Sequence, residues 1–123
     1  MTSYKIVWHG IFDYQYKHLQ KNSPLKRQID TQLRVISSDP VNAGTPLKFL
    51  PEDLAGKIRK LWVGGRKGHR MIIKTNHQER LVKVVFVTPE KRGHIDYKKL
   101  IRDLVDFIDG QVEEKMLKKF IIK

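Results

Sequence analysis

Residues 91–97, Lys-Arg-Gly-His-Ile-Asp-Tyr, bring together cations, an imidazole and a phenol. This segment follows an apolar run, 81–87, that is typical of a strand, and it opens a stretch with helical periodicity. Side chains of these types bind phosphate groups and transfer protons near neutral pH. The spacing therefore predicts chemistry on a polyanion at a strand end, and the candidate residues here are Lys91, Arg92, His94 and Tyr97.

The positive charge is concentrated in the middle of the chain. The net charge is +12, and residues 54–95 hold 11 basic and 2 acidic side chains, whereas residues 1–53 hold 7 and 5 and residues 96–123 hold 7 and 6. A surplus concentrated in this way attracts nucleic acid, acidic protein segments or anionic membrane, whereas a merely soluble surface would spread its charge. We therefore favour a nucleic-acid partner.

Composition also bears on compartment and cofactors. The absence of cysteine is compatible with a reducing cytosol, and no apolar run approaches the ~20 residues of a membrane span. The first residues lack the apolar region of a secretory signal. We expect a cytoplasmic protein. His9, His18 and His77 are scattered without ligand-like spacing, so no zinc site is expected.

Hydrophobic periodicity predicts one α+β domain. The expected elements are a strand over 4–8, a helix with a stripe at 12, 16 and 19, a helix from Pro24 to Ser38 capped by Ser23, strands over 57–63, 69–75 and 79–87, and a helix over 97–108. The short loops between the last three strands favour an antiparallel meander. We expect an N-terminal strand and a helical hairpin packed on a twisted antiparallel sheet of about four strands, with a C-terminal helix nearby.

Several short motifs follow one another in a recognisable order. They are Asp39-Pro40, the stretches 44–48 and 54–59, Val63-Gly64, the run 68–73 (Gly-His-Arg-Met-Ile-Ile), and Lys91-Arg92 with Asp96-Tyr97. Together they resemble the RelE/ParE superfamily of bacterial and archaeal toxins over about residues 3–108. The departures are a hairpin enlarged at 66–68, Trp62 where a basic residue is common, and a C-terminal segment beyond the usual end. We therefore divide the chain into a RelE-like domain, 1–110, and a helical extension, 111–123.

The resemblance implies a toxin-type endoribonuclease that cuts mRNA on the ribosome and so inhibits translation. It implies attack by the RNA 2′-hydroxyl on the adjacent phosphate, with no metal or cofactor, and neutralisation by an acidic antitoxin in a hetero-oligomer. Arg70 matches the family's strand arginine that supports the transition state, and Arg92 matches its post-strand arginine. Tyr97 matches the C-terminal tyrosine that stacks on or orients the substrate base.

Further cations are expected to bind phosphates of mRNA or ribosomal RNA. In one alignment Lys57 and Arg59 match the family's pair of strand cations, and in another Lys60 takes over this role, so both assignments stay open. The full set of expected phosphate-binding residues is Lys57, Arg59, Lys60, Arg66, Lys67, Lys74 and Lys91.

Alternation along a strand places Arg70 on one face with Ile72 and Lys74, away from a core that contains Met71 and Ile73. The competing interpretation is that Arg70 is a solvated strand residue or pairs with Glu79.

Other residues also carry two interpretations. His94 is a general acid or base, or an inert loop histidine. Tyr97 either contacts the substrate or is a core residue that packs a helix against the domain. Trp8 and Trp62 are expected in the core.

Two other functions remain open. A ParE-like toxin shares the fold but poisons DNA gyrase, and a non-catalytic RNA-binding protein explains the charge equally well. The stripe formed by Val112, Met116 and Phe120 must pack on something, because a short amphipathic helix is not stable by itself in water. It packs either on its own domain or beside an antitoxin-binding groove.

Overall fold

The polypeptide forms two helices and five strands over residues 4–47, 56–65 and 68–88, which are the residues that the computed structural model describes. In chain order these elements are β1 (Lys5–Trp8), α1 (Gly10–Lys17), α2 (Pro24–Ser38), β2 (Thr45–Pro46), β3 (Ile58–Val63), β4 (His69–Asn76) and β5 (Leu81–Val87). The predicted α+β class is confirmed. The expected helix over 97–108 and the extension 111–123 lie outside the described residues.

The strands form one sheet in the order β1-β5-β4-β3-β2. Strands β3, β4 and β5 make the predicted antiparallel meander, but β1 pairs in parallel with β5 along its whole length. The described sheet is therefore mixed and five-stranded, and the expectation of a wholly antiparallel sheet of about four strands is wrong. The strand that the sequence did not predict is β2. It has only two residues, one of them Pro46, so hydrophobic periodicity could not reveal it.

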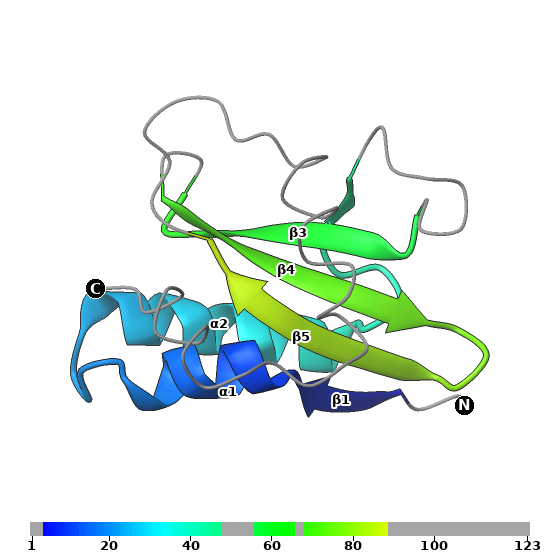
Figure 1. Ribbon diagram of the computed structural model, residues 1–123. Helices are drawn as coiled ribbons and strands as arrows, with labels where there is room; N and C mark the ends of the chain where they lie inside the picture. Colours follow the sequence, from blue (N-terminus) through cyan, green and yellow to red (C-terminus); the bar gives the residue numbers. More distant parts are fainter. Residues whose placement is uncertain (1–3, 48–55, 66–67, 89–123) are drawn as a thin grey trace.

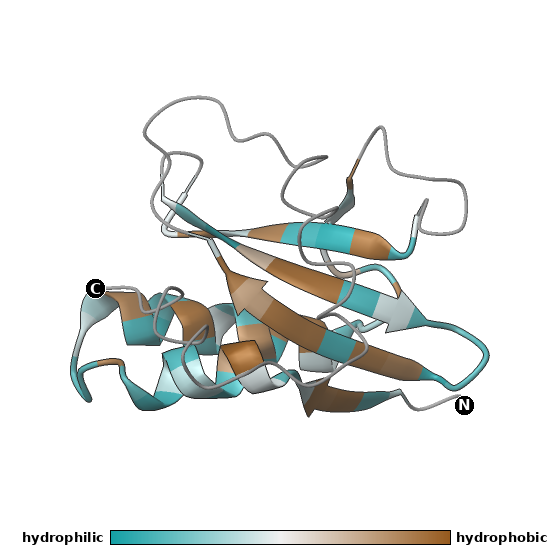
Figure 2. Cartoon of the chain, viewed as in Figure 1, coloured by the Kyte–Doolittle hydropathy of each residue, from teal (hydrophilic) through white to brown (hydrophobic). Residues whose placement is uncertain are grey.

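Both helices cover the same face of the sheet (Figure 1). Phe12 of α1 and Ile29 of α2 are fully buried in one cluster with Met71 and Ile73 of β4. Figure 2 shows hydrophobic residues along most of β5 and much of β4, where this core lies. Alternation then leaves the even-numbered positions of β4, including Arg70, on the other face of the sheet.

Local signals determine where α2 begins and ends. The side chain of Ser23 accepts a hydrogen bond from the Lys26 amide at 3.1 Å, and Pro24 occupies the first turn, where its missing amide hydrogen costs nothing. The amide of Asp39 closes the other end by donating to the carbonyl of Val35. The predicted boundaries of this helix are confirmed.

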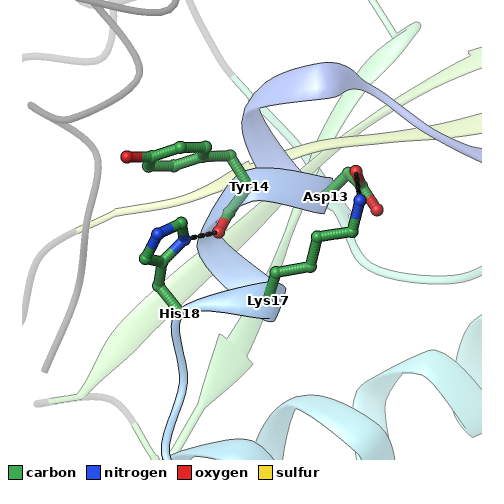
Figure 3. A network of polar contacts seen from close by, with 4 residues as sticks. All are labelled: Asp13, Tyr14, Lys17 and His18. Carbon is green, nitrogen blue, oxygen red and sulfur yellow. Dashed lines mark hydrogen bonds and ion pairs between the residues drawn. The ribbon is translucent and has the colours of Figure 1, made fainter.

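Helix α1 has less obvious termini. Its N-cap is His9, whose Nδ1 accepts from the Ile11 amide at 3.1 Å, so this histidine has a structural role that its sequence position did not indicate. At the other end Lys17 pairs with Asp13 at 2.8 Å, while the ring of His18 hydrogen-bonds to the Tyr14 carbonyl (Figure 3).

Gln15 joins α1 to the end of β5. Its side-chain amide donates to the Val87 carbonyl and its carbonyl oxygen accepts from the Val87 amide, each at 2.8 Å. Because β1 reaches only as far as Val84 along β5, Gln15 satisfies backbone groups that no strand pairs on that side. The end of β5, directly before the segment that contains residues 91–97, is thereby fixed to the helical layer.

Tyr16 provides a pH-dependent contact between the two helices. Its hydroxyl donates to Asp30 at 2.6 Å, and this hydrogen bond, together with burial and the nearby negative charge, raises the pKa of Tyr16 from 10.0 to about 12. The unfolded chain therefore loses this proton first, so the stability from the contact is present below pH 10 and is lost between pH 10 and 12. We expect Tyr16→Phe to flatten the stability profile in that window, as measured by urea denaturation at several pH values. An unchanged slope would contradict this assignment.

Among the described residues, no helix is long and apolar enough to cross a membrane.

Candidate nucleic-acid interface

The β3–β4 hairpin depends on a close approach that only glycine permits. A Cβ on Gly68 would lie 2.3 Å from the carbonyl oxygen of Val63, well inside van der Waals contact. The preceding turn uses Gly64 at φ +79°, in the left-handed region. These glycines bring the end of β3 and the start of β4 together, and so set the register that places Trp62 directly opposite Arg70.

Arg70 is the largest fully buried side chain among the described residues, with 1 % of its surface exposed. Its guanidinium carbon lies 4.3 Å from the ring centroid of Trp62, which is cation–π distance. Its Nη1 also approaches the Gly68 carbonyl at 3.5 Å, a weak contact. The guanidinium is therefore held against an aromatic face at the hairpin end of the sheet.

This placement excludes both competing interpretations of Arg70. A solvated strand residue would be exposed, and Arg70 is not. Glu79 lies in the turn beyond the far end of β4, more than six strand residues or ~20 Å away along the chain direction. The expectation that Arg70 faces away from the helical core is confirmed, since its neighbours Met71 and Ile73 belong to that core.

Thr88, directly after β5, fixes the backbone of Arg70 from the other side. The Thr88 hydroxyl accepts from the Arg70 amide at 3.0 Å, and the Thr88 amide donates to the Arg70 carbonyl at 2.8 Å. Thr88 therefore anchors both backbone polar groups of Arg70, and it is also the residue that follows β5 in the sequence before residues 91–97. The sequence analysis did not single out Thr88, and only the pairing of β4 with β5 identifies it.

His69 is tied to the same residue. Its Nδ1 lies 2.8 Å from the Thr88 carbonyl, and because a carbonyl only accepts, Nδ1 donates this hydrogen bond. His69 pairs with Val63, a member of the helix-facing core, so it lies on the opposite face from Arg70.

Register also separates the two alignments of the strand cations. Lys60 lies on the face of Trp62, with its Nζ 5.0 Å from the ring centroid. Arg59 lies on the other face of β3, where its Nη1 donates to the Val41 carbonyl at 3.1 Å. Lys60, rather than Arg59, therefore shares a face with Arg70. We call Lys60, Trp62 and Arg70 the cation–aromatic cluster.

The two tryptophans differ from the expectation of core positions. Trp8 is 41 % exposed and contacts Phe12 edge-on at 4.9 Å, because it stands at the end of an edge strand. Trp62 is half-buried, on the face of the sheet that the helices do not cover. The sequence did contain a signal for this position, because Trp62 lies two residues after Lys60 and therefore shares a strand face with this cation.

Lys57 and Lys74 lie at the opposite end of β3 and β4 from the cation–aromatic cluster. The remaining sequence-predicted residues, which are Arg66, Lys67, Lys91, Arg92, His94 and Tyr97, lie outside the described residues, and their roles remain predictions. Within the described ranges no group of three or more histidine, aspartate or glutamate side chains could hold a metal ion.

Comparison with known proteins finds similarity in structure only. No protein-family model matches the sequence, and no curated protein matches it either. The isolated E. coli RelE toxin superposes with a TM-score of 0.56 at 16% identity, covering 83% of this chain and 99% of RelE. The archaeal RelE–RelB complex from Pyrococcus horikoshii gives a TM-score of 0.53 at 17% identity, covering 75% of this chain and 100% of the other.

A third solved structure, described as a YoeB/ParE toxin from Agrobacterium tumefaciens, gives a TM-score of 0.54 at 18% identity and covers 71% of this chain and 99% of that chain. Nearly the whole length of each of these three chains is matched. The protein therefore has the RelE-like toxin fold.

Proposed function

We propose that this protein is a toxin of a toxin–antitoxin system that cleaves mRNA on the ribosome. The observation that carries the proposal is the cation–aromatic cluster on a RelE-like sheet. It contains Arg70, which the sequence motifs match to the family's strand arginine. Two cations beside one aromatic ring suit RNA, because the cations bind phosphate and the ring supports a base or a guanidinium. Solved structures with this fold include toxin–antitoxin complexes, which supports an antitoxin as partner.

The proposed reaction needs no atom from outside RNA and protein. The 2′-oxygen bonds to the adjacent phosphorus as its proton leaves, and the bond to the 5′-oxygen breaks as that oxygen gains a proton. The products are a 2′,3′-cyclic phosphate and a 5′-hydroxyl. Arg70 and Lys60 neutralise the charge that builds on the phosphoryl oxygens. His94 and Tyr97 are the proposed proton-transfer and base-contacting residues, with Arg92 as a second phosphate ligand.

Burial of Arg70 places a condition on this activity. A guanidinium that is 1 % exposed is reached by RNA only after that face of the sheet opens, so the proposed activity includes such an opening. The same observation favours one alternative, a non-catalytic RNA-binding protein in which Arg70 stiffens the hairpin and the exposed lysines bind phosphate.

A ribosome assay tests the proposal. We expect purified protein, added to ribosomes programmed with a defined mRNA, to yield fragments ending in a cyclic phosphate. Intact mRNA with retained binding would support the non-catalytic alternative. A ParE-like toxin would instead leave mRNA intact and inhibit supercoiling by DNA gyrase, which a parallel topology assay detects.

A further inference from the structure

The hydrogen bonds at the end of β5 depart from those of a regular sheet. The pairing of Met71 with Val87 continues to Arg70 and Thr88, where each backbone amide would ordinarily donate to the carbonyl of the other residue. The Thr88 amide does donate to the Arg70 carbonyl, at 2.8 Å. The Arg70 amide instead donates to the Thr88 hydroxyl, at 3.0 Å. The side chain of Thr88 therefore takes the place that its own carbonyl has in a regular ladder.

The Thr88 carbonyl has a different partner. It accepts a hydrogen bond of 2.8 Å from Nδ1 of His69, the residue directly before Arg70. We call His69, Arg70 and Thr88 the strand-exit clamp. Arg70 and Thr88 are both buried, so water does not readily replace a hydrogen bond that a substitution removes from the clamp. The clamp therefore determines where the Arg70 backbone lies relative to the end of β5.

Thr88 is itself held in place by its neighbours in the chain. The side chain of Gln15 bonds to both the amide and the carbonyl of Val87, each at 2.8 Å, and so fixes the residue before Thr88 to α1. Pro89 is next in the sequence, and a proline restricts the residue before it to extended backbone angles. Thr88 is thus a fixed point, and loss of its hydroxyl displaces Arg70 rather than the end of β5.

A displaced Arg70 backbone matters because the guanidinium lies far from its own Cα. The guanidinium carbon lies 4.3 Å from the centroid of the Trp62 ring, at the end of a long side chain. A small rotation of the backbone is therefore amplified at the charged group. A displacement of about 1 Å between reacting groups typically costs about 10²-fold in rate, even when the substituted residue does not touch the substrate.

We propose that Thr88 is a positioning residue for the cleavage reaction. Its hydroxyl holds the Arg70 backbone, and with it the guanidinium, where the reacting phosphate binds. This inference rests on the proposed function in taking Arg70 as a ligand of that phosphate. Thr88 acts through Arg70 and does not contact RNA, because Thr88 is buried and its hydroxyl oxygen lies against the Arg70 amide.

The chain offers a matched pair of isosteric substitutions to test this role. Thr88→Val removes the hydroxyl that accepts from the Arg70 amide, whereas Thr88→Ser keeps a hydroxyl. Thr75→Val makes the same change in β4, at an equally buried threonine whose hydroxyl has no hydrogen-bond partner within the described part of the chain. Urea denaturation establishes that all three variants fold. Single-turnover cleavage of mRNA on ribosomes then gives the maximal rate and the apparent affinity separately.

We expect Thr88→Val to lower the maximal rate by about 10–10²-fold with little change in apparent affinity, Thr88→Ser to recover most of the rate, and Thr75→Val to cut as the parent does. A double-mutant cycle tests whether Thr88 acts through Arg70. In the Arg70→Ala background, Thr88→Val should slow cleavage no further. Parent-rate cleavage by Thr88→Val would overturn the inference, and so would an undiminished extra loss in the Arg70→Ala background.

Fluorescence separates this inference from the proposed nuclease activity. In a Trp8→Phe background Trp62 is the sole tryptophan, and its emission reports on the guanidinium beside its ring. We expect Thr88→Val to shift this emission in the same direction as Arg70→Ala does, and Thr75→Val to leave it unchanged. If the protein cuts no mRNA but the emission shifts in this way, the nuclease proposal fails and the positioning of Arg70 by Thr88 stands. An emission that Thr88→Val leaves unshifted overturns the positioning role whether or not the protein cuts mRNA.

Discussion

Replacing Arg70 by alanine is expected to lower the rate of mRNA cleavage on ribosomes by about 10²–10³-fold, the usual cost of removing a group that stabilises transition-state charge. The Arg70 guanidinium stacks on Trp62 at 4.3 Å, and Thr88 hydrogen-bonds to both the amide and the carbonyl of the Arg70 backbone. The position of Arg70 is therefore defined before substrate arrives. Arg70→Lys should restore only part of the rate, because an ammonium lacks the planar fork that contacts two phosphoryl oxygens at once.

Stability must be measured beside the rate, since Arg70 is buried. Its removal leaves a cavity and takes away one of the two cations beside Trp62, and we expect a loss of about 1–3 kcal/mol in the free energy of unfolding. Ile72→Val is a matched control on the same face of β4, also fully buried, with an expected loss of about 0.5–1.5 kcal/mol. Single-turnover cleavage at a temperature where all variants are folded separates the two effects. If Ile72→Val slowed cleavage as much as Arg70→Ala, the catalytic role would be excluded.

Helix α2 was predictable because its determinants are close together in the sequence. A serine cap, a proline at the first position and a stripe of apolar residues each act within a few residues, and the structure confirms all three. The three long strands were predictable for a similar reason. Short glycine- or asparagine-containing loops join them, and neighbouring strands joined in this way pair with one another.

The parallel pairing of β1 with β5 could not be predicted in the same way. The partners are separated by more than seventy residues, as Lys5 and Leu81 show, so no local signal in the sequence indicates that they pair. The edge position of β1 also explains the exposure of Trp8. Its apolar neighbours suggested a core residue, but among the described residues its strand has no partner on its outer side.

The candidate site was predicted by residue type, but its geometry was not. Alternation alone placed Arg70 on the correct face, since this needs only the period of a strand. Its burial depends on Trp62, and that contact follows from the register that Gly68 permits across the hairpin. The same register places Lys60, and not Arg59, on the face of Arg70, a distinction that the sequence motifs left open.

The affinity of this protein for RNA is expected to fall about a hundredfold as monovalent salt rises from ~50 to ~200 mM. Among the cations on or beside β3, β4 and β5, we expect five to bind phosphate, and they are Lys57, Lys60, Arg70, Lys74 and Lys83. If each neutralises one phosphate of a single strand, the slope of log affinity against log salt is about −3.5, from ~0.7 per phosphate. A fourfold change in salt then changes log affinity by about two.

Single substitutions make this prediction specific to the sheet. Lys60→Gln should reduce the slope by ~0.7, because it removes one phosphate contact, whereas Lys21→Gln, between the two helices, should leave it unchanged. Fluorescence anisotropy of a labelled, 2′-methylated RNA measures both values without interference from cleavage. A slope near zero would mean that RNA binding does not depend on neutralisation of phosphates. Equal changes of slope in Lys60→Gln and Lys21→Gln would mean that the protein binds RNA through its overall charge, so that the position of the cations on the sheet contributes nothing.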